Sequence, residues 1–205
     1  MILFSDTYKE IKVNSKGLYK EKGSKFIAYA YKVYSEKEIK KKLNIIKSKE
    51  HAAQHHCYAY ILNPDYSNEK FNDDGEPSST AGRPILRQIK KNNLTNILII
   101  VSRYFGGTKL GIPGLIRSYK TAANSAIKDN IIIEKTIKEF YQIYFNYTEM
   151  NHVMKIIKEF KLEIVHKEIT EECRIQISIR KSIVEMVISA LQKNYKIKIE
   201  YINRN

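Results

Sequence analysis

The sequence contains little cysteine and no long apolar run, and each shortage excludes a class of protein. Its 205 residues include two cysteines, Cys57 and Cys173, with no CxxC spacing. They predict neither a disulfide framework nor a structural zinc site, so a reducing cytoplasm is the expected location. The longest purely apolar run, Ile97 to Val101, is about a quarter of a membrane span. Because the first residues also lack a basic stretch followed by an apolar one, we expect a protein that is neither exported nor inserted in a membrane.

Glycine and proline are scarce, and they are concentrated in one part of the chain. Six of the eight glycines and all four prolines lie between Pro64 and Gly114, and neither residue occurs after Gly114. Glycine permits positive φ and close approach of the backbone, and proline stiffens turns. The unusual backbone is therefore expected in this window, together with any function that depends on loops.

Acidic residues are outnumbered by basic ones. Lys and Arg total 36 against 22 Asp and Glu, a net charge of +14, which favours a polyanionic partner such as RNA, DNA or an acidic protein surface. Biased base composition is an alternative source of this charge in a chain so rich in Lys, Ile and Asn. A more specific signal is the stretch from Pro77 to Lys128, which holds nine basic residues and no Asp or Glu.

Hydrophobic periodicity predicts the elements of the first two thirds of the chain. Ser35 and Glu38 form a capping box that opens a Lys-rich helix. The run from Asn96 to Arg103 is typical of a strand buried on both faces. The other expected features are a hairpin of residues 7–13 and 25–33 around Gly17, a strand at 56–62, a long loop from there to Gly82, and helices at 82–92 and 114–128.

From residue 131 onward the expected order is β-α-β-β-α-β, which is the ferredoxin-like motif. A boundary near residue 136 follows, with residues 1–135 as one α+β domain and residues 136–205 as a second.

A glycine-rich loop runs from the buried strand into the helix at 114–128. It reads Phe105-Gly106-Gly107-Thr108-Lys109-Leu110-Gly111 and lacks the spacing of a Walker loop or a dinucleotide fingerprint. Strand, glycine loop and helix is an order that presents backbone N–H groups to an anion, with Lys109, Arg117 and Arg103 as charge partners. The alternative is a tight structural turn against a neighbouring strand.

Three carboxylates, Asp73, Asp74 and Glu76, cluster on the loop before residue 82. We favour ion pairs with Arg83, Arg103 or Arg117 that fix the loops, over a Mg²⁺ site or a general base. A hydroxyl among residues 78–80 is expected to cap the following helix.

His55 and His56 precede Cys57, and a strand would direct His56 and Cys57 to opposite faces. The histidines are candidates for the wall of a polar site or for a structural role. We assign no metal site, no catalytic residue and no required cofactor.

Three segments together resemble the signature of the IMPACT family and its bacterial YigZ-type members. They are His55-His56-Cys57-Tyr58-Ala59-Tyr60, residues 73–86 from Asp73-Asp74-Gly75-Glu76-Pro77 onward, and Val101-Ser102-Arg103-Tyr104-Phe105-Gly106-Gly107-Thr108-Lys109-Leu110-Gly111. Gly23-Ser24-Lys25-Phe26-Ile27 is similar to a further motif of the family. Two positions depart from it, because Ser79 and Pro113 replace glycines that the family usually has.

The resemblance implies an α+β protein of two domains. The N-terminal one would be ribosomal protein S5 domain 2-like, and the C-terminal one ferredoxin-like and similar to domains of elongation factor G. It also implies a regulator of translation, since eukaryotic members compete for the activator of a kinase that acts on an initiation factor.

We therefore expect a cytoplasmic, RNA- or ribosome-associated regulator of translation. The alternatives are an enzyme acting on a phosphorylated or acyl small molecule through the glycine loop, and a protein-interaction module without catalysis. The residues expected to bind nucleic acid or an anion are Lys25, Arg83, Arg103, Tyr104, Gly106, Gly107, Lys109, Gly111 and Arg117. Those expected to organise the loops or form a polar site are His55, His56, Asp73, Asp74 and Glu76.

Overall fold

A computed structural model describes residues 6–204. The chain divides into two compact units, and it passes between them twice. The first unit is Tyr8–Lys135, and the second combines residues 6–7 with the chain from Thr136 onward. Mixed helix and strand in both units confirms the expected α+β composition.

The first unit is built on a five-stranded sheet of order β2-β3-β6-β4-β5, in which all the neighbouring strands run antiparallel. Its strands are β2 (Ser15–Glu21), β3 (Ser24–Lys32), β4 (His55–Leu62), β5 (Asn68–Asn72) and β6 (Ile97–Tyr104). The central strand β6 is buried along its length except at its last residue, as its apolar run predicts. A separate two-stranded sheet pairs β1 (Thr7–Ile11) with β7 (Ile132–Thr136).

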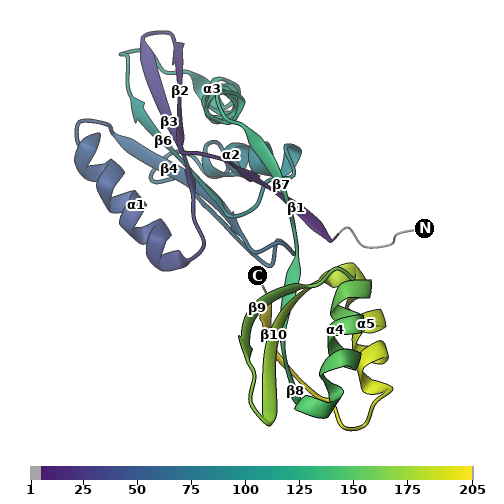
Figure 1. Cartoon of the computed structure of the whole chain (residues 1–205). Coiled ribbons are helices and arrows are strands. Elements are labelled where there is room, and N and C mark those ends of the chain that lie inside the picture. The colour runs from purple at the N-terminus through teal and green to yellow at the C-terminus, as the bar shows by residue number, and fades with distance from the viewer. Residues whose placement is uncertain (1–5, 205) are drawn as a thin grey trace. The chain divides into compact units, whose positions relative to one another are not determined.

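Three helices cover the two faces of this sheet (Figure 1). They are α1 (Glu36–Lys49), α2 (Gly82–Lys91) and α3 (Gly111–Lys128). Helices α2 and α3 share one face, where alternate strand residues such as Phe26, Ala59 and Ile99 form the larger core with them. Helix α1 packs on the other face against the intervening residues, among them Ile27 and Leu98. Each strand residue is thereby assigned to the α1 face or to the face of α2 and α3.

Helix α1 begins as its sequence predicts. Ser35 is its N-cap, and the Ser35 hydroxyl accepts a hydrogen bond from the Glu38 N–H. The Glu38 carboxylate in turn accepts the N–H of Tyr34. This reciprocal pair satisfies donors that a helix start otherwise leaves open.

Two expectations about the first unit are wrong. Residues 7–13 and 25–33 do not form a hairpin, because β1 pairs with β7 and β3 pairs with β2, which contains Gly17. The turn between β2 and β3 falls at Lys22 and Gly23, both at positive φ. A Cβ on Gly17 would stand 2.4 Å from the backbone nitrogen of Ala126, so this glycine lets α3 lie directly on the strand. The expected loop after residue 62 contains β5, which is short, half-exposed and lacks the apolar alternation that predicts strands.

The second unit follows the element order β-α-β-β-α-β. Its elements are β8 (Lys138–Asn146), α4 (Met150–Glu159), β9 (Glu163–Glu168), β10 (Glu172–Arg180), α5 (Val184–Gln192) and β11 (Lys198–Arg204). They form an antiparallel sheet of order β11-β8-β10-β9, and the apolar residues of its strands share a core with α4 and α5. Across residues 6–204, no helix is both long enough and apolar enough to cross a bilayer.

Candidate functional site

A buried polar network joins the signature segments of the first unit. The Arg103 guanidinium donates to the Glu76 carboxylate over 2.6 Å, and both side chains are less than a tenth exposed. The Tyr119 hydroxyl donates to the same carboxylate oxygen over 2.8 Å. The Cys57 thiol donates to the Asp73 carbonyl and contacts the Tyr119 hydroxyl. The three signature segments therefore meet at one ion pair. Of the three arginines expected to pair with the acidic loop, Arg103 does so, whereas Arg117 pairs with Glu21 of β2.

The Arg103 side chain belongs to the interior of the protein. Its guanidinium lies 5.6 Å from the Phe26 ring centroid and 5.7 Å from that of Phe105. Its Nε atom is buried and has no hydrogen-bond partner within the described part of the chain. The expectation of a surface contact for Arg103 conflicts with this burial, because β6 directs its side chain toward the core under α3.

Asp73 caps helix α2 from the preceding loop. One carboxylate oxygen accepts the N–H groups of Ala81 and Gly82, at 3.0 and 2.8 Å, and the other accepts the N–H of Ser79 at 2.9 Å. A hydroxyl cap was expected here, but the N-cap residue is Ala81, which has no hydroxyl. The carboxylate supplies the acceptors instead and places negative charge at a helix N-terminus.

Ser79 adopts the left-handed backbone conformation, with φ of +62°. Glycine reaches this region without a steric penalty. The conformation is one that favours glycine, and this chain has serine there.

Asp74 and the two histidines form a second group of contacts. The Asp74 carboxylate accepts the backbone N–H of His56 at 2.7 Å, and its carbonyl accepts the ring N–H of His55 at 2.8 Å. The His56 ring lies 2.9 Å from the Ser102 hydroxyl, and burial lowers the pKa of His56 below its ordinary value. His56 and Cys57 do point to opposite faces of the sheet, as predicted.

The thiol of Cys57 is unsuited to nucleophilic chemistry. It is fully buried, and burial raises the pKa of this thiol well above its ordinary value. Within residues 6–204, no three His, Cys, Asp or Glu side chains are grouped so that they would hold a metal ion.

The glycine-rich loop turns tightly against the β2–β3 hairpin. A Cβ on Gly106 would stand 1.9 Å from the carbonyl carbon of Gly23, so no larger residue fits. The N–H of Gly106 donates to the Ser24 hydroxyl, and that of Phe105 donates to the Gln54 side chain. These two N–H groups are engaged within the protein, which supports the structural-turn alternative for this part of the loop.

The rest of the loop faces outward. Gly107 and Gly111 have positive φ, and Lys109 is exposed. Helix α3 begins at Gly111 with Pro113 in its first turn, where proline is tolerated.

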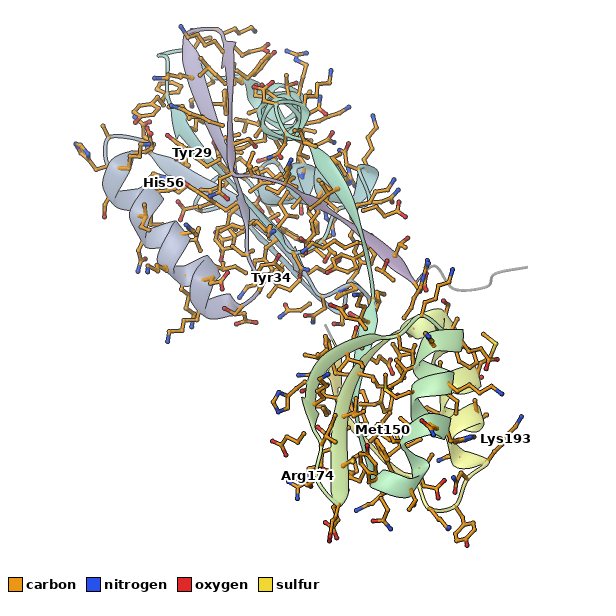
Figure 2. The ribbon with its side chains drawn as sticks, viewed as in Figure 1. Tyr29, Tyr34, His56, Met150, Arg174 and Lys193 are labelled. Carbon is orange, nitrogen blue, oxygen red and sulfur yellow. The ribbon has the colours of Figure 1, made fainter. Side chains whose placement is uncertain are left out.

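The structure separates the residues that the sequence groups into one face. Lys25 and Tyr104 lie directly opposite each other on the α1 face of the sheet. Arg83 and Arg117 are exposed on α2 and α3, which cover the other face. Figure 2 labels Tyr29 and His56, which belong to the α1 face with Lys25. Sequence alone did not assign these residues to opposite faces.

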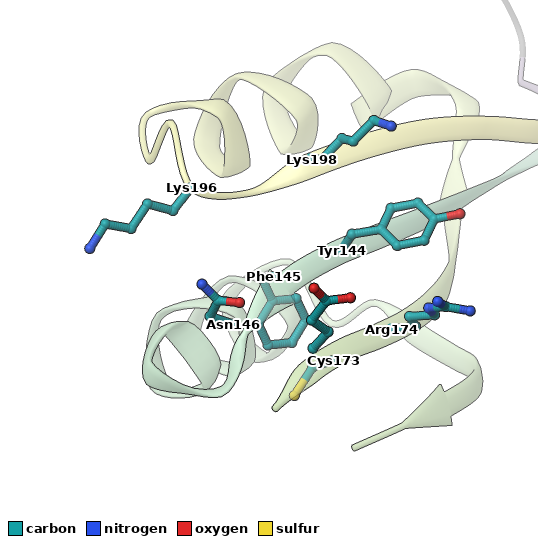
Figure 3. Close-up of a pocket in the computed structure, with 8 residues that line it drawn as sticks. Tyr144, Phe145, Asn146, Cys173, Arg174, Lys196 and Lys198 are labelled. Carbon is teal, nitrogen blue, oxygen red and sulfur yellow. The ribbon is translucent and has the colours of Figure 1, made fainter. Parts of the chain in front are cut away.

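The second unit contains a shallow cleft of about 250 Å³ at one end of its sheet (Figure 3). Tyr144 of β8 lies between the neighbouring strands, and the cations of Arg174 and Lys198 are 5.9 and 5.7 Å from its ring centroid. Glu200 accepts the Tyr144 hydroxyl and pairs with Lys198 at 2.7 Å. Sequence analysis did not identify this aromatic and basic cluster, because its residues come from three separate strands.

Comparison with known proteins identifies the family that the signature segments predict. The family model for the Impact N-terminal domain matches residues 22–127. The IMPACT family member YvyE of Bacillus subtilis is 34% identical over 145 residues, which cover 70% of this chain and 67% of the relative. YigZ of Escherichia coli K12 is 32% identical over 118 residues, 57% of this chain and 58% of the relative.

A solved structure described as that of a hypothetical protein has the same fold. It aligns with a TM-score of 0.70 over 98% of this chain and 99% of that one, at 22% identity. With the family model covering more than half of its residues, the chain belongs to the IMPACT family.

Proposed function

We propose that this protein binds RNA or a ribosome-associated partner and thereby regulates translation. One observation carries the proposal. Of the nine basic residues in the acid-free stretch from Pro77 to Lys128, eight are exposed, and Arg103 is the exception. Solvated positive charge of this density favours a polyanion and accelerates encounter with it.

Most of these residues form what we call the basic helix surface. It comprises the exposed basic residues of α2 and α3, which are Arg83, Arg87, Lys90, Lys91, Arg117, Lys120 and Lys128. The two helices pack together on one face of the sheet, so their polar stripes share the outward side. Acids partly neutralise it, because Lys90 pairs with Glu69 and Arg117 pairs with Glu21. Lys109 extends the surface into the loop before α3.

The translational part of the proposal rests on the family. Within it, we propose that residues 1–135 and 136–205 act as two domains. We further propose that the first is ribosomal protein S5 domain 2-like and the second ferredoxin-like. The strand order β11-β8-β10-β9 with both helices on one face supports the second assignment. The location that this function requires is the cytoplasm.

Two of the carboxylates that could serve an enzyme are already held by other groups of the protein. Asp73 is occupied by three backbone N–H groups, and Glu76 by Arg103 and Tyr119. A carboxylate held in this way is not free to abstract a proton or bind Mg²⁺. Asp74 is the remaining candidate, since its side chain is 31% exposed, accepts the His56 N–H and lies 3.8 Å from the Lys47 ammonium. With two of the three carboxylates engaged, we propose binding without turnover.

The test is binding of the full chain to a structured RNA and to isolated ribosomes across a salt series. A triple variant, Arg87→Gln with Lys109→Gln and Lys120→Gln, removes three exposed charges from the proposed surface. If each contacts a phosphate, the slope of log affinity against log salt falls by about 2 to 3. The matched control, Lys155→Gln with Lys158→Gln and Lys193→Gln, removes three exposed charges from the second unit.

Micromolar or tighter binding by the wild type, with a slope that the triple variant reduces and the control keeps, supports the proposal. No binding by the wild type at physiological salt contradicts it. Ribosome retention that survives nuclease treatment assigns a protein partner in place of RNA.

A further inference from the structure

A second basic surface lies on the opposite face of the sheet, beside α1. Sequence alternation brings its residues together, because Lys16 lies opposite Tyr29, Lys20 opposite Lys25, and Lys25 opposite Tyr104 across neighbouring strands. Tyr31 of β3 and two lysines of α1 complete it. We call this set the lysine–tyrosine surface: Lys16, Lys20, Lys25, Lys42, Lys49, Tyr29, Tyr31 and Tyr104.

Its ammonium groups lie close to aromatic rings. Tyr29 and Tyr31 stack, with centroids 6.3 Å apart and planes inclined by 7°. The Nζ atoms of Lys16 and Lys49 are 5.5 and 5.3 Å from the Tyr29 centroid, and that of Lys42 is 5.0 Å from Tyr31. Lys25 is 5.4 Å from the Tyr104 centroid. Each contact is within the range of a cation–π interaction.

Within residues 6–204, none of these five lysines forms an ion pair with an acid. The nearby Glu50 is buried, and its carboxylate accepts hydrogen bonds from the hydroxyls of Tyr29 and Tyr104. Burial alone would raise the pKa of Glu50, but these two hydrogen bonds, with a smaller effect of the Lys16 and Lys49 charges, hold it below its ordinary value. The Glu50 carboxylate thus positions the Tyr29 and Tyr104 rings next to the lysines of this surface.

Two features of this surface cost stability. Lys20 and Lys25 are exposed and directly opposite on one face of the sheet, and like charges in such a pair destabilise it. Leu18, between Lys16 and Lys20 on the same edge strand, is 50% exposed. A ligand with negative charges and flat apolar groups would offset both costs.

We propose that the lysine–tyrosine surface binds unpaired nucleotides of RNA. This inference rests on the proposed function and names the RNA structure that the α1 face recognises. Phosphates lie against Lys16, Lys20 and Lys25, and bases stack on the exposed parts of Tyr31 and Tyr104. Unpaired bases offer a π-face that a duplex conceals, whereas an acidic peptide offers charge without rings.

The experiment measures binding of a fluorescent single-stranded 12-mer RNA and of a 12-base-pair RNA duplex to the full chain. The charge variant is Lys20→Gln with Lys25→Gln, and the ring variant is Tyr31→Leu with Tyr104→Leu. The control is Lys155→Gln with Lys158→Gln, two exposed lysines of the second unit. A further variant, Arg87→Gln with Lys120→Gln, tests the basic helix surface in the same assay. Circular dichroism establishes that each variant is folded.

For the single strand, we expect the charge variant to lower the salt slope by about 1.4. We expect the ring variant to weaken affinity about tenfold or more at an unchanged slope. The second-unit control should keep its single-strand affinity within a few fold. Poly-glutamate, which has charge but no bases, should compete poorly.

Wild-type affinity of both sheet variants for the single strand overturns the inference. If the helix-surface variant binds the single strand more weakly and both sheet variants do not, the proposed function stands and the further inference is overturned. Poly-glutamate competition as strong as that of RNA, with an unaffected ring variant, assigns the surface to an acidic protein and overturns the inference. Absence of any RNA or ribosome binding by the wild type overturns both proposals.

Discussion

The buried pair of Arg103 and Glu76 permits a quantitative test of what holds the signature segments together. Replacing Glu76 by leucine leaves the guanidinium without its carboxylate, in a position where the Arg103 side chain is 8% exposed. Its Nε atom already lacks a hydrogen-bond partner among residues 6–204, so the loss of Glu76 adds to an unsatisfied buried group. Removing one partner of a buried pair costs about 3 to 5 kcal/mol, and we expect Glu76→Leu to fall in this range.

The second half of the test removes both charges. Replacing a buried ion pair by apolar residues of similar volume is often neutral, so the double variant Glu76→Leu with Arg103→Leu should cost about 2 kcal/mol or less. That remainder includes the lost acceptor of the Tyr119 hydroxyl. The two single substitutions should therefore be strongly non-additive.

Urea unfolding of the full chain, followed by circular dichroism, measures these free energies. The chain has two compact units, so two transitions are fitted where the curves require them. Glu76→Leu should lower the midpoint of the transition of Tyr8–Lys135 and leave the other unchanged. A cost below about 1 kcal/mol for Glu76→Leu, or a double variant that costs the sum of both singles, would refute the reasoning. If the folded double variant keeps its RNA affinity, Arg103 is not a binding residue.

Three further predictions concern the loops and pH. Asp73→Ala should destabilise the first unit by about 2 kcal/mol, since three N–H groups lose their acceptor, and Asp73→Asn by less, since one oxygen remains; urea unfolding ranks the two. Gly106→Ala should cost about 3 kcal/mol or more because its Cβ meets backbone, whereas Gly107→Ala, in open space at φ +86°, should cost about 1 to 2 kcal/mol; equal costs would contradict the close approach of Gly106 to Gly23. The lowered pKa of His56 means that the unfolded chain binds more protons, so stability should fall as pH drops through about 6.5, and His56→Gln should flatten this decline in unfolding experiments from pH 7.5 to 5.5.

Local patterns were sufficient to predict many elements. The apolar run of β6 and the capping box of α1 depend on neighbouring residues alone, and both formed as expected. The pairing of Glu76 with Arg103 was also predictable, since an acidic loop next to an acid-free basic stretch has few other partners.

The errors have a shared cause in tertiary contacts. Gly17 was assigned to a turn because its role depends on α3, which follows a hundred residues later. The cap of α2 was assigned to a nearby hydroxyl, whereas Asp73 reaches it from eight residues before Ala81. β5 forms because β4 offers it an edge, and its own pattern gives no sign of this.

The candidate site was harder to predict than the fold. The sequence position of a basic residue does not reveal whether its side chain points into the core or toward solvent. That direction depends on the register of its strand in the sheet. One residue of difference separates Arg103, which is buried toward α3, from Tyr104, which faces Lys25 on the other side. The binding face expected from sequence therefore becomes two surfaces and an interior ion pair.

Because Asp6 belongs to the second unit, the two units complete their folding at different times during synthesis. The Asp6 carboxylate accepts two hydrogen bonds from Arg180, 174 residues later, and its carbonyl accepts the N–H of Ile137. During synthesis the first unit has all of its chain once Lys135 has emerged, and it folds first. The Asp6 contacts with Arg180 form only after residue 180 has been synthesised, so this part of the second unit is completed later than the first unit. A fragment that begins at Thr136 lacks this clamp from the outset.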